Sequence, residues 1–174
     1  AFKQLENVII IRPGVIRGGG DIFMKRLLPI FKASFFVPLF GDGSTKFQPV
    51  FIDDVSLAVD EIINSKIKGK NIYELAGPRI YSYKEFFNYI SNFLKKTRVF
   101  VPVPMAFMRP MINIAEKTPI SPLTSEQLTL FEKDNLVVNV DKSFQNLNIN
   151  PQDTLQILKN LSLIHISEPT RQHW

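Results

Sequence analysis

The stretch with the strongest chemical suggestion is IIIRPGVIRGGGD, residues 9–21, in which an apolar run enters a glycine-rich loop. Glycines after a strand let the backbone approach a phosphate closely, and they also form plain turns. The glycines at positions 14, 18, 19 and 20 do not give the G-x-G-x-x-G spacing of the primary dinucleotide fingerprint. The residues alone therefore leave two interpretations open, a structural turn and a ligand-facing loop.

Two adjacent carboxylates, Asp53 and Asp54, are the next candidates for chemistry. Neighbours in sequence project in different directions, so they form a poor acid/base pair, and we expect Asp54 to cap the helix that follows. The chain has no cysteine and shows no Ser-His-Asp, zinc-ligand or P-loop pattern. We therefore expect no catalytic residue and no metal site in this chain.

The last fourteen residues, LSLIHISEPTRQHW, contain both histidines and the single tryptophan. Residues 161–171 resemble a translated sequencing-adapter sequence, and we expect 161–174 to be a non-native tail. We exclude this tail from functional reasoning, as one excludes an expression scar. Histidine acid/base chemistry and histidine metal ligation then disappear from residues 1–160.

The elements that must position these residues follow from hydropathy and turn signals, starting with a buried strand over 7–12 that ends at Pro13. Asp21 is expected to cap a helix over 22–33, which Pro29 should kink or divide. Residues 36–52 suggest two extended pieces around a Gly-Asp-Gly turn. The next helix presents an apolar face at helical spacing, formed by Val55, Ala58, Val59, Ile62 and Ile63.

The second half of the chain continues the alternation with a strand over 71–77 and a helix that opens with a Ser82–Glu85 capping box. The aromatic residues of 83–94 have helical spacing, so core packing is favoured over an aromatic binding site, and the helix should end at Lys95–Lys96. A strand over 98–103 follows. A helix with Pro104 in its first turn is expected to run to about 117, with an interruption at Pro110. A second helix should begin with a Thr124–Gln127 capping box and run to about 133, and a third is expected over 154–160. Alternating strands and helices define an α/β protein.

Composition places few limits on function. The chain has 174 residues, 45% hydrophobic and 21% charged, which suits one ordinary domain or part of a larger one. The formal net charge of +5 is mild, and the basic residues are scattered, so no nucleic-acid partner is expected. Lys25, Arg26 and Lys32 flank an apolar helix, either as a solvated face or as a contact with a membrane surface. No apolar run approaches about 18 residues, and no signal peptide is recognisable.

Three motifs in order, IIIRPGVIRGGGD, PLFGDGSTKFQPVFIDDVSLAV and YELAGPRIYSYKEF, resemble the C-terminal half of extended and atypical short-chain dehydrogenases/reductases, the NAD-dependent epimerase/dehydratase superfamily. Within it, the chain is most similar to the group of the nucleotide-binding accessory subunit of respiratory complex I (NADH:ubiquinone oxidoreductase), and SPLTSEQLTLFEKDNLVV supports that subgroup. The resemblance covers nearly all of 1–160. It implies the C-terminal part of a Rossmann-type parallel sheet plus a small, mostly helical substrate lobe.

The resemblance also implies a site. Pro13, Gly14, Val15 and Ile16 would line the nicotinamide end of NAD or NADP, whereas the phosphates would be held by a glycine-rich turn outside this chain. Arg17 departs from the aromatic residue usual at its position and is a candidate of the substrate lobe. Phe47 and Gln48 stand where nucleotide-sugar enzymes have Arg-Asp-Phe. An apolar ring cannot hold a diphosphate, so these two residues would face an apolar or quinone-like ligand, or simply pack.

Two family motifs are absent, the G-x-x-G-x-x-G turn and the catalytic Tyr-x-x-x-Lys pair. We therefore expect 1–160 to be the C-terminal half of a longer protein, itself inactive and with weak or no cofactor binding. The parent would be an accessory or assembly component of complex I, cytoplasmic and peripheral on the inner membrane, with helices 22–33 and 104–117 contacting the complex or lipid. The alternative is an NAD(P)-dependent oxidoreductase or epimerase for a small carbonyl or hydroxyl substrate.

Overall fold

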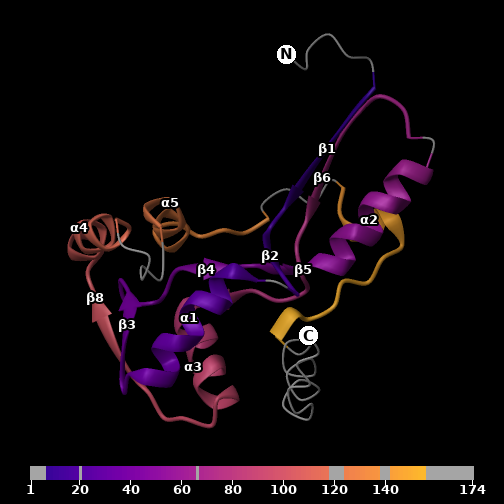
Figure 1. Ribbon diagram of the computed structural model, residues 1–174. Coiled ribbons are helices and arrows are strands. Elements are labelled where there is room, and N and C mark those ends of the chain that lie inside the picture. Colours follow the sequence, from indigo (N-terminus) through magenta and orange to yellow (C-terminus); the bar gives the residue numbers. More distant parts are fainter. Residues whose placement is uncertain (1–6, 20, 66, 118–123, 138–141, 156–174) are drawn as a thin grey trace, which may run out of the picture.

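The computed structural model describes residues 7–19, 21–65, 67–117, 124–137 and 142–155. The proposed tail, residues 161–174, and most of the helix expected over 154–160 lie outside this described part. Two groups of elements are visible in Figure 1, with β1, β6 and α2 at one end of the molecule and β3, β8, α1, α3 and α4 at the other. Each group has its own buried hydrophobic cluster.

The first group is a parallel pair of strands with a helix packed beside it. Strands β1 (Val8–Pro13) and β6 (Lys70–Leu75) pair from Val8 opposite Lys70 to Pro13 opposite Leu75. Helix α2 (Ile52–Asn64) turns Ala58 and Ile62 into the same cluster as Tyr73 and Leu75. A parallel pair requires a long crossover connection, and here the connection contains β2, α1, β3, β4 and β5 of the second group followed by α2, whereas the rest of the second group follows β6.

The second group is a lobe of helices around short strand pairs. Strands β2 (Val15–Arg17) and β5 (Pro49–Phe51) are parallel, as are β3 (Phe36–Phe40) and β8 (Val99–Val103), whereas β4 (Lys46–Phe47) and β7 (Tyr81–Ser82) are antiparallel. Helices α1 (Ile22–Ala33), α3 (Tyr83–Phe93), α4 (Met105–Ala115) and α5 (Ser125–Leu128) surround them. The 3-10 helix η2 (Thr129–Phe131) continues α5, and η3 (Phe144–Leu147) packs beside β6.

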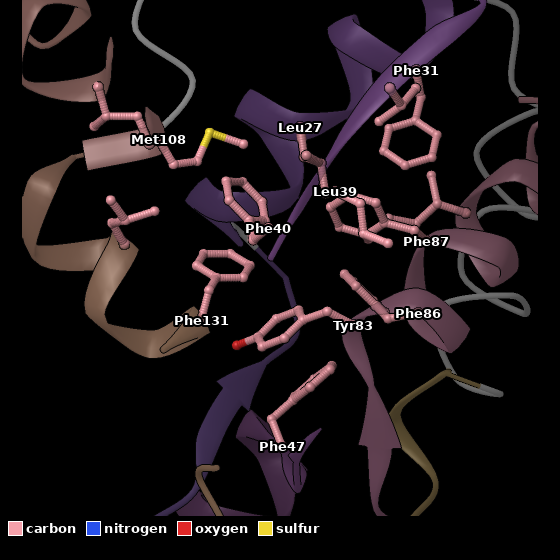
Figure 2. Close-up of a cluster of buried hydrophobic side chains, with 14 of the residues drawn as sticks. Leu27, Phe31, Leu39, Phe40, Phe47, Tyr83, Phe86, Phe87, Met108 and Phe131 are labelled. Carbon is pink, nitrogen blue, oxygen red and sulfur yellow. The ribbon is translucent and has the colours of Figure 1, made fainter. Parts of the chain in front are cut away.

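Aromatic side chains fill the core of the lobe, as the helical spacing of 83–94 predicted. Tyr83 stacks on Phe47 with ring centroids 4.6 Å apart, and Phe131 contacts Tyr83 at 4.3 Å. Phe31 meets Phe87 edge-on at 5.2 Å. Figure 2 shows these rings converging from α1, β4, α3 and η2. Contacts between elements so far apart in sequence make the lobe one packed unit.

Most of the predicted elements are confirmed within a few residues. The Asp21 side chain accepts a hydrogen bond from Met24 N and caps α1, and both capping boxes form. Helix α1 continues through Pro29 as one element. The region of 36–52 contains three strands where two extended pieces were expected, because β4 and β5 find different partners. Pro104 is the N-cap of α4 and does not enter the first turn, and the α-helix after Thr124 ends at Leu128, earlier than predicted.

Two predictions about α2 are wrong. The helix begins at Ile52 after Phe51, so Asp54 lies inside its first turn and is not the cap. Asp54 is instead 1% exposed, and it accepts hydrogen bonds from the backbone N–H of Gln152 at 2.8 Å and from its side chain at 3.4 Å. Ile63 was expected on the buried face and is 74% exposed. Asp54 therefore anchors the 150–154 segment to α2.

Replacing Asp54 by alanine is expected to lower the free energy of unfolding by about 2 kcal/mol, because the buried carboxylate that accepts two hydrogen bonds from Gln152 is lost. Urea unfolding followed by far-UV circular dichroism measures the change. Asp53→Ala is the matched control, since Asp53 is the exposed neighbour in the same turn and should change stability by less than about 0.5 kcal/mol. Equal effects of the two substitutions would remove the anchoring role of Asp54.

Candidate functional site

The candidate site lies where the chain leaves the β1–β6 sheet and enters the lobe. The carboxyl ends of β1 and β6 meet at one edge, with Pro13 opposite Leu75, and Gly14 N donates a hydrogen bond to Leu75 O at 2.8 Å. Directly afterwards, β2 turns to pair with β5, so that Val15 lies opposite Pro49. Ligands of open parallel sheets bind outside the carboxyl ends of the strands, so this junction is where a ligand is expected.

Two glycines let three backbone segments meet at this junction. A Cβ atom on Gly14 would lie 2.5 Å from the carbonyl oxygen of Gln48, and one on Gly77 would overlap the carbonyl oxygen of Pro49. Real Cβ atoms essentially never come so close, so only glycine fits. The ends of β1 and β6 thus both press against the Gln48–Pro49 backbone.

Gly18 and Gly19 lie in a turn that leads to α1. Gly18 has a φ of +153°, and its carbonyl oxygen accepts a hydrogen bond from Asp21 N at 3.3 Å. A Cβ on Gly18 would also collide with the side chain of Ile52. For Gly18 the geometry is that of a structural turn, whereas Gly14 serves close backbone packing at the edge of the sheet.

Gln48 connects the junction to two further segments. Its side-chain amide donates to Gly77 O at 2.8 Å and accepts from Val137 N at 3.4 Å, and its backbone N–H donates to Asn135 O at 3.0 Å. Gln48 also lines an open cleft of about 440 Å³ together with Glu74, Ser143 and Asn150 among others. None of Pro13–Ile16 lines this cleft, so the structure does not bring all the predicted site residues to one cavity.

Arg17 points into the core of the lobe. Its side chain is 3% exposed and forms an ion pair with Asp21 at 2.7 Å. Its guanidinium carbon lies 4.9 Å from the centre of the Phe86 ring and 5.9 Å from that of Phe47. The face of an aromatic ring attracts a cation, so the rings stabilise the buried charge together with the carboxylate. The charge of Arg17 is therefore compensated inside the lobe by Asp21 and the aromatic rings. No pattern in the sequence indicated these partners.

The remaining predicted residues divide between surface and core. Pro13 and Ile16 are exposed at the edge of the sheet, with Gly14 and Val15 half-buried between them. Phe47 is fully buried and stacked on Tyr83, which matches the packing alternative. Within the described ranges, no three His, Asp or Glu side chains gather as a metal ion would require.

Burial raises the pKa of Tyr83 to about 12, although the positive charge of Arg17 opposes the shift. A folded-state pKa above the ordinary value of 10 stabilises the fold below pH 10, and this contribution is lost as the pH rises from 10 to 12. We expect the free energy of unfolding to fall by about 2 kcal/mol more across this window in the wild type than in Tyr83→Phe. Urea unfolding at a series of pH values measures the difference. Parallel pH profiles for the two proteins would contradict the prediction.

Solved structures with a similar fold define the class. No family model matches the chain. A nucleoside-diphosphate-sugar epimerase from Staphylococcus aureus superposes with a TM-score of 0.61 and 17% identity over 88% of this chain and 52% of that one. MoeE5 in complex with UDP-glucuronic acid and NAD gives a TM-score of 0.61 and 12% identity over 91% of this chain and 48% of that one. The chain has the α/β fold of about half of such an epimerase/dehydratase, which confirms the predicted fold class.

Sequence relatives narrow the class. The chain is 29% identical over 162 residues to the mitochondrial NADH dehydrogenase (ubiquinone) 1 alpha subcomplex subunit 9 of Arabidopsis thaliana, covering 86% of this chain and 40% of the relative. It is 27% identical over 146 residues to the mitochondrial NADH-ubiquinone oxidoreductase 40 kDa subunit of Neurospora crassa, covering 83% of this chain and 38% of the relative. These homologues are complex I subunits, which confirms the resemblance stated above. The chain spans about 40% of the length of the curated relatives that it matches.

Proposed function

We propose that residues 1–160 are the C-terminal half of a longer NAD(P)-binding protein that serves complex I as an accessory or assembly component. The observation that carries the proposal is the junction at the carboxyl ends of β1 and β6, where Gly14 and Gly77 pack on Gln48–Pro49. The relatedness to two complex I subunits supports the assignment of the partner.

Pro13, Gly14, Val15 and Ile16 fit one end of a dinucleotide. They form a short apolar surface at the sheet edge, exposed at Pro13 and Ile16, and a nicotinamide ring can lie against such a surface. When bound, NAD(P) would supply a redox-active ring, and this chain's residues would position it. The glycine-rich G-x-x-G-x-x-G turn is absent from this sequence, so such a turn in an N-terminal half would hold the phosphates. Binding by this chain alone is expected to be weak or absent.

The alternative function is that of an NAD(P)-dependent oxidoreductase or epimerase acting on a small carbonyl or hydroxyl substrate. The fold supports it, because the similar solved structures include epimerases. Against a nucleotide-sugar substrate stands Phe47, whose ring is fully buried on Tyr83 and cannot pair with a diphosphate. A Tyr-x-x-x-Lys pair upstream of this chain would favour the enzyme, because that pair supplies the acid/base group.

The proposed location is peripheral on the inner membrane. The names of both relatives print the word mitochondrial. For a mitochondrial source the proposed location is therefore the inner mitochondrial membrane, and for a bacterial source it is the cytoplasmic face of the inner membrane. In the described part of the chain, no helix has the length and apolar character to cross a bilayer.

The test uses the complete reading frame, recovered by resequencing the source locus across both ends of this chain. NADH binding to the complete protein is measured by fluorescence, with Ile16→Asp as the variant. Leu57→Asp is the control, because Leu57 is exposed like Ile16 but lies on α2, outside the proposed site. We expect Ile16→Asp to weaken NADH binding about tenfold or more, since a charge would face the ring. Copurification with complex I subunits tests the partner. A complete protein that binds neither NADH nor NADPH would overturn the cofactor part of the proposal. One that does not copurify with complex I subunits would overturn the part about the partner.

A further inference from the structure

The outer face of the β3–β8 sheet is apolar and open. Phe36 pairs with Val99 and Pro38 with Val101, and paired residues of a parallel ladder share one face. Phe36 is 60% exposed, and Val99 and Val101 are each 41% exposed. Val37 and Leu39 point to the opposite face of the sheet, are 1% exposed and pack in the core of the lobe, so the outer face is not needed to form that core.

Helix α4 extends this apolar face. Met108 and Ile112 are buried, whereas Phe107, Met111 and Ile114 form a second apolar stripe that faces outward. An apolar groove of about 50 Å³ joins Met111 to Pro38. Figure 1 shows α4, β8 and β3 together at the end of the molecule away from β1 and α2. We call this surface the α4–β8 face and define it by Phe36, Val99, Val101, Phe107, Met111 and Ile114.

The α4–β8 face lies within two longer segments of the chain that carry positive charge only. Residues 22–41 and 86–115 contain no Asp or Glu, and their seven basic residues are Lys25, Arg26, Lys32, Lys95, Lys96, Arg98 and Arg109. Arg109 pairs with Glu132 from outside these segments, so six bases are left to face other partners. Glu116, at the end of α4, and Glu132 are acidic residues beside the face, so the bases outnumber the acids there without excluding them.

Part of the positive charge lies directly beside the apolar surface. The Lys96 ammonium donates to Lys32 O at 3.0 Å, and Arg98 donates to Phe31 O at 2.6 Å. These contacts join the end of α1 to the start of β8, where Val99 N donates to Phe35 O. The bases therefore form a rim at the Phe36–Val99 end of the α4–β8 face.

We propose that the α4–β8 face docks on an anionic lipid surface. Side chains as exposed as Phe107 at 70% and Ile114 at 71% suit insertion into the headgroup boundary of a bilayer. The groove at Met111, at about 50 Å³, is too small to seat a partner helix. Buried apolar area and attraction between bases and anionic headgroups are the two contributions that hold peripheral proteins on membranes. An exposed apolar surface of this extent is uncommon on a protein without such a contact. The proposal depends neither on cofactor binding nor on complex I.

Vesicle flotation with the 174-residue chain tests the proposal, because aggregated protein sinks while bound protein rises with the lipid. The vesicles are phosphatidylcholine alone or phosphatidylcholine with about one third phosphatidylglycerol. We expect flotation with the anionic vesicles at low salt, reduced by high salt and by omission of phosphatidylglycerol. Ile114→Ser is expected to weaken binding about tenfold, since burial of one isoleucine side chain contributes roughly that much.

Ile63→Ser is the matched control, because Ile63 on α2 is 74% exposed and lies outside the α4–β8 face. Lys96→Glu should also weaken binding, whereas Lys68→Glu, at an exposed lysine before β6, should have a smaller effect. Three results would overturn the proposal: no flotation at low salt, equal loss for Ile63→Ser and Ile114→Ser, or equal binding to both kinds of vesicle. Capture of complex I subunits without vesicle binding would assign the face to a protein partner instead.

Discussion

Replacing Asp21 by alanine is expected to lower the free energy of unfolding by about 3–5 kcal/mol, the usual cost of breaking a buried ion pair. The Asp21 carboxylate holds the buried Arg17 guanidinium at 2.7 Å and also caps α1 at Met24 N. Without the carboxylate, a positive charge stays on the Arg17 side chain, which is only 3% exposed. Since small domains are stable by only about 5–15 kcal/mol, this single change should bring the lobe close to unfolding.

A double-substitution cycle separates the ion pair from the helix cap. Arg17→Met removes the buried charge, so Asp21→Ala added to it should cost only the cap, about 1 kcal/mol. Urea unfolding followed by circular dichroism gives all four stabilities. Asp60→Ala, at an exposed acid on α2, is the control for loss of a surface charge. If Asp21→Ala cost no more than Asp60→Ala, the buried pair would not support the lobe.

Gly77→Ala is expected to be the most damaging substitution among the glycines that the structure describes. Its Cβ would overlap the backbone oxygen of Pro49, and a backbone carbonyl cannot rotate away as the end of a flexible side chain can. Overpacking of this kind typically costs about 1–3 kcal/mol, and here it would also separate the end of β6 from the Gln48 amide. Thermal unfolding of the 174-residue chain should show a clear fall in Tm.

Gly19→Ala is the matched control, because a Cβ at Gly19 would meet nothing within 4 Å. Its Tm should stay at or slightly above that of the wild type, since alanine restricts the unfolded chain more than glycine does. Gly14→Ala should fall between the two. A Gly77→Ala protein as stable as Gly19→Ala would mean that the β6 end and the Gln48–Pro49 backbone are not packed as closely as the structure shows.

Local signals in the sequence predicted what depends on neighbours along the chain. The cap at Asp21 and the Ser82–Glu85 capping box satisfy donors three residues away, so a short motif contains both partners. The aromatic spacing of α3 predicted its buried face for the same reason, because helical periodicity is a local property. The strand over 7–12 could be recognised from its continuous apolar run, whereas β2 falls in the stretch that the sequence assigned to a glycine-rich loop.

Distant partners could not be predicted in the same way. The role of Asp54 depends on its hydrogen bonds with Gln152, which is distant in the sequence. The local pattern of an aspartate before an amphipathic helix favoured a capping role instead. The burial of Arg17 depends on Phe47 and Phe86, which come from other elements. For the candidate site, sequence indicated Pro13–Ile16 and Gln48, but the tight contact of Gly77 with Pro49 appears only when both strands are placed.

The pairing of the strands also has a kinetic consequence. Val8 finds its partner at Lys70, Val15 at Pro49, and Phe36 at Val99, so every parallel pair closes a long loop before it gains a contact. The entropy cost of closing such a loop comes before the strand pair gains any stabilising contact, and proteins rich in distant pairings therefore fold slowly. On the ribosome, β1 cannot be paired by β6 until the intervening residues 14–69 have been synthesised. During this interval its apolar residues remain available to chaperones, which makes delayed pairing of β1 the step at which folding of this chain is most vulnerable.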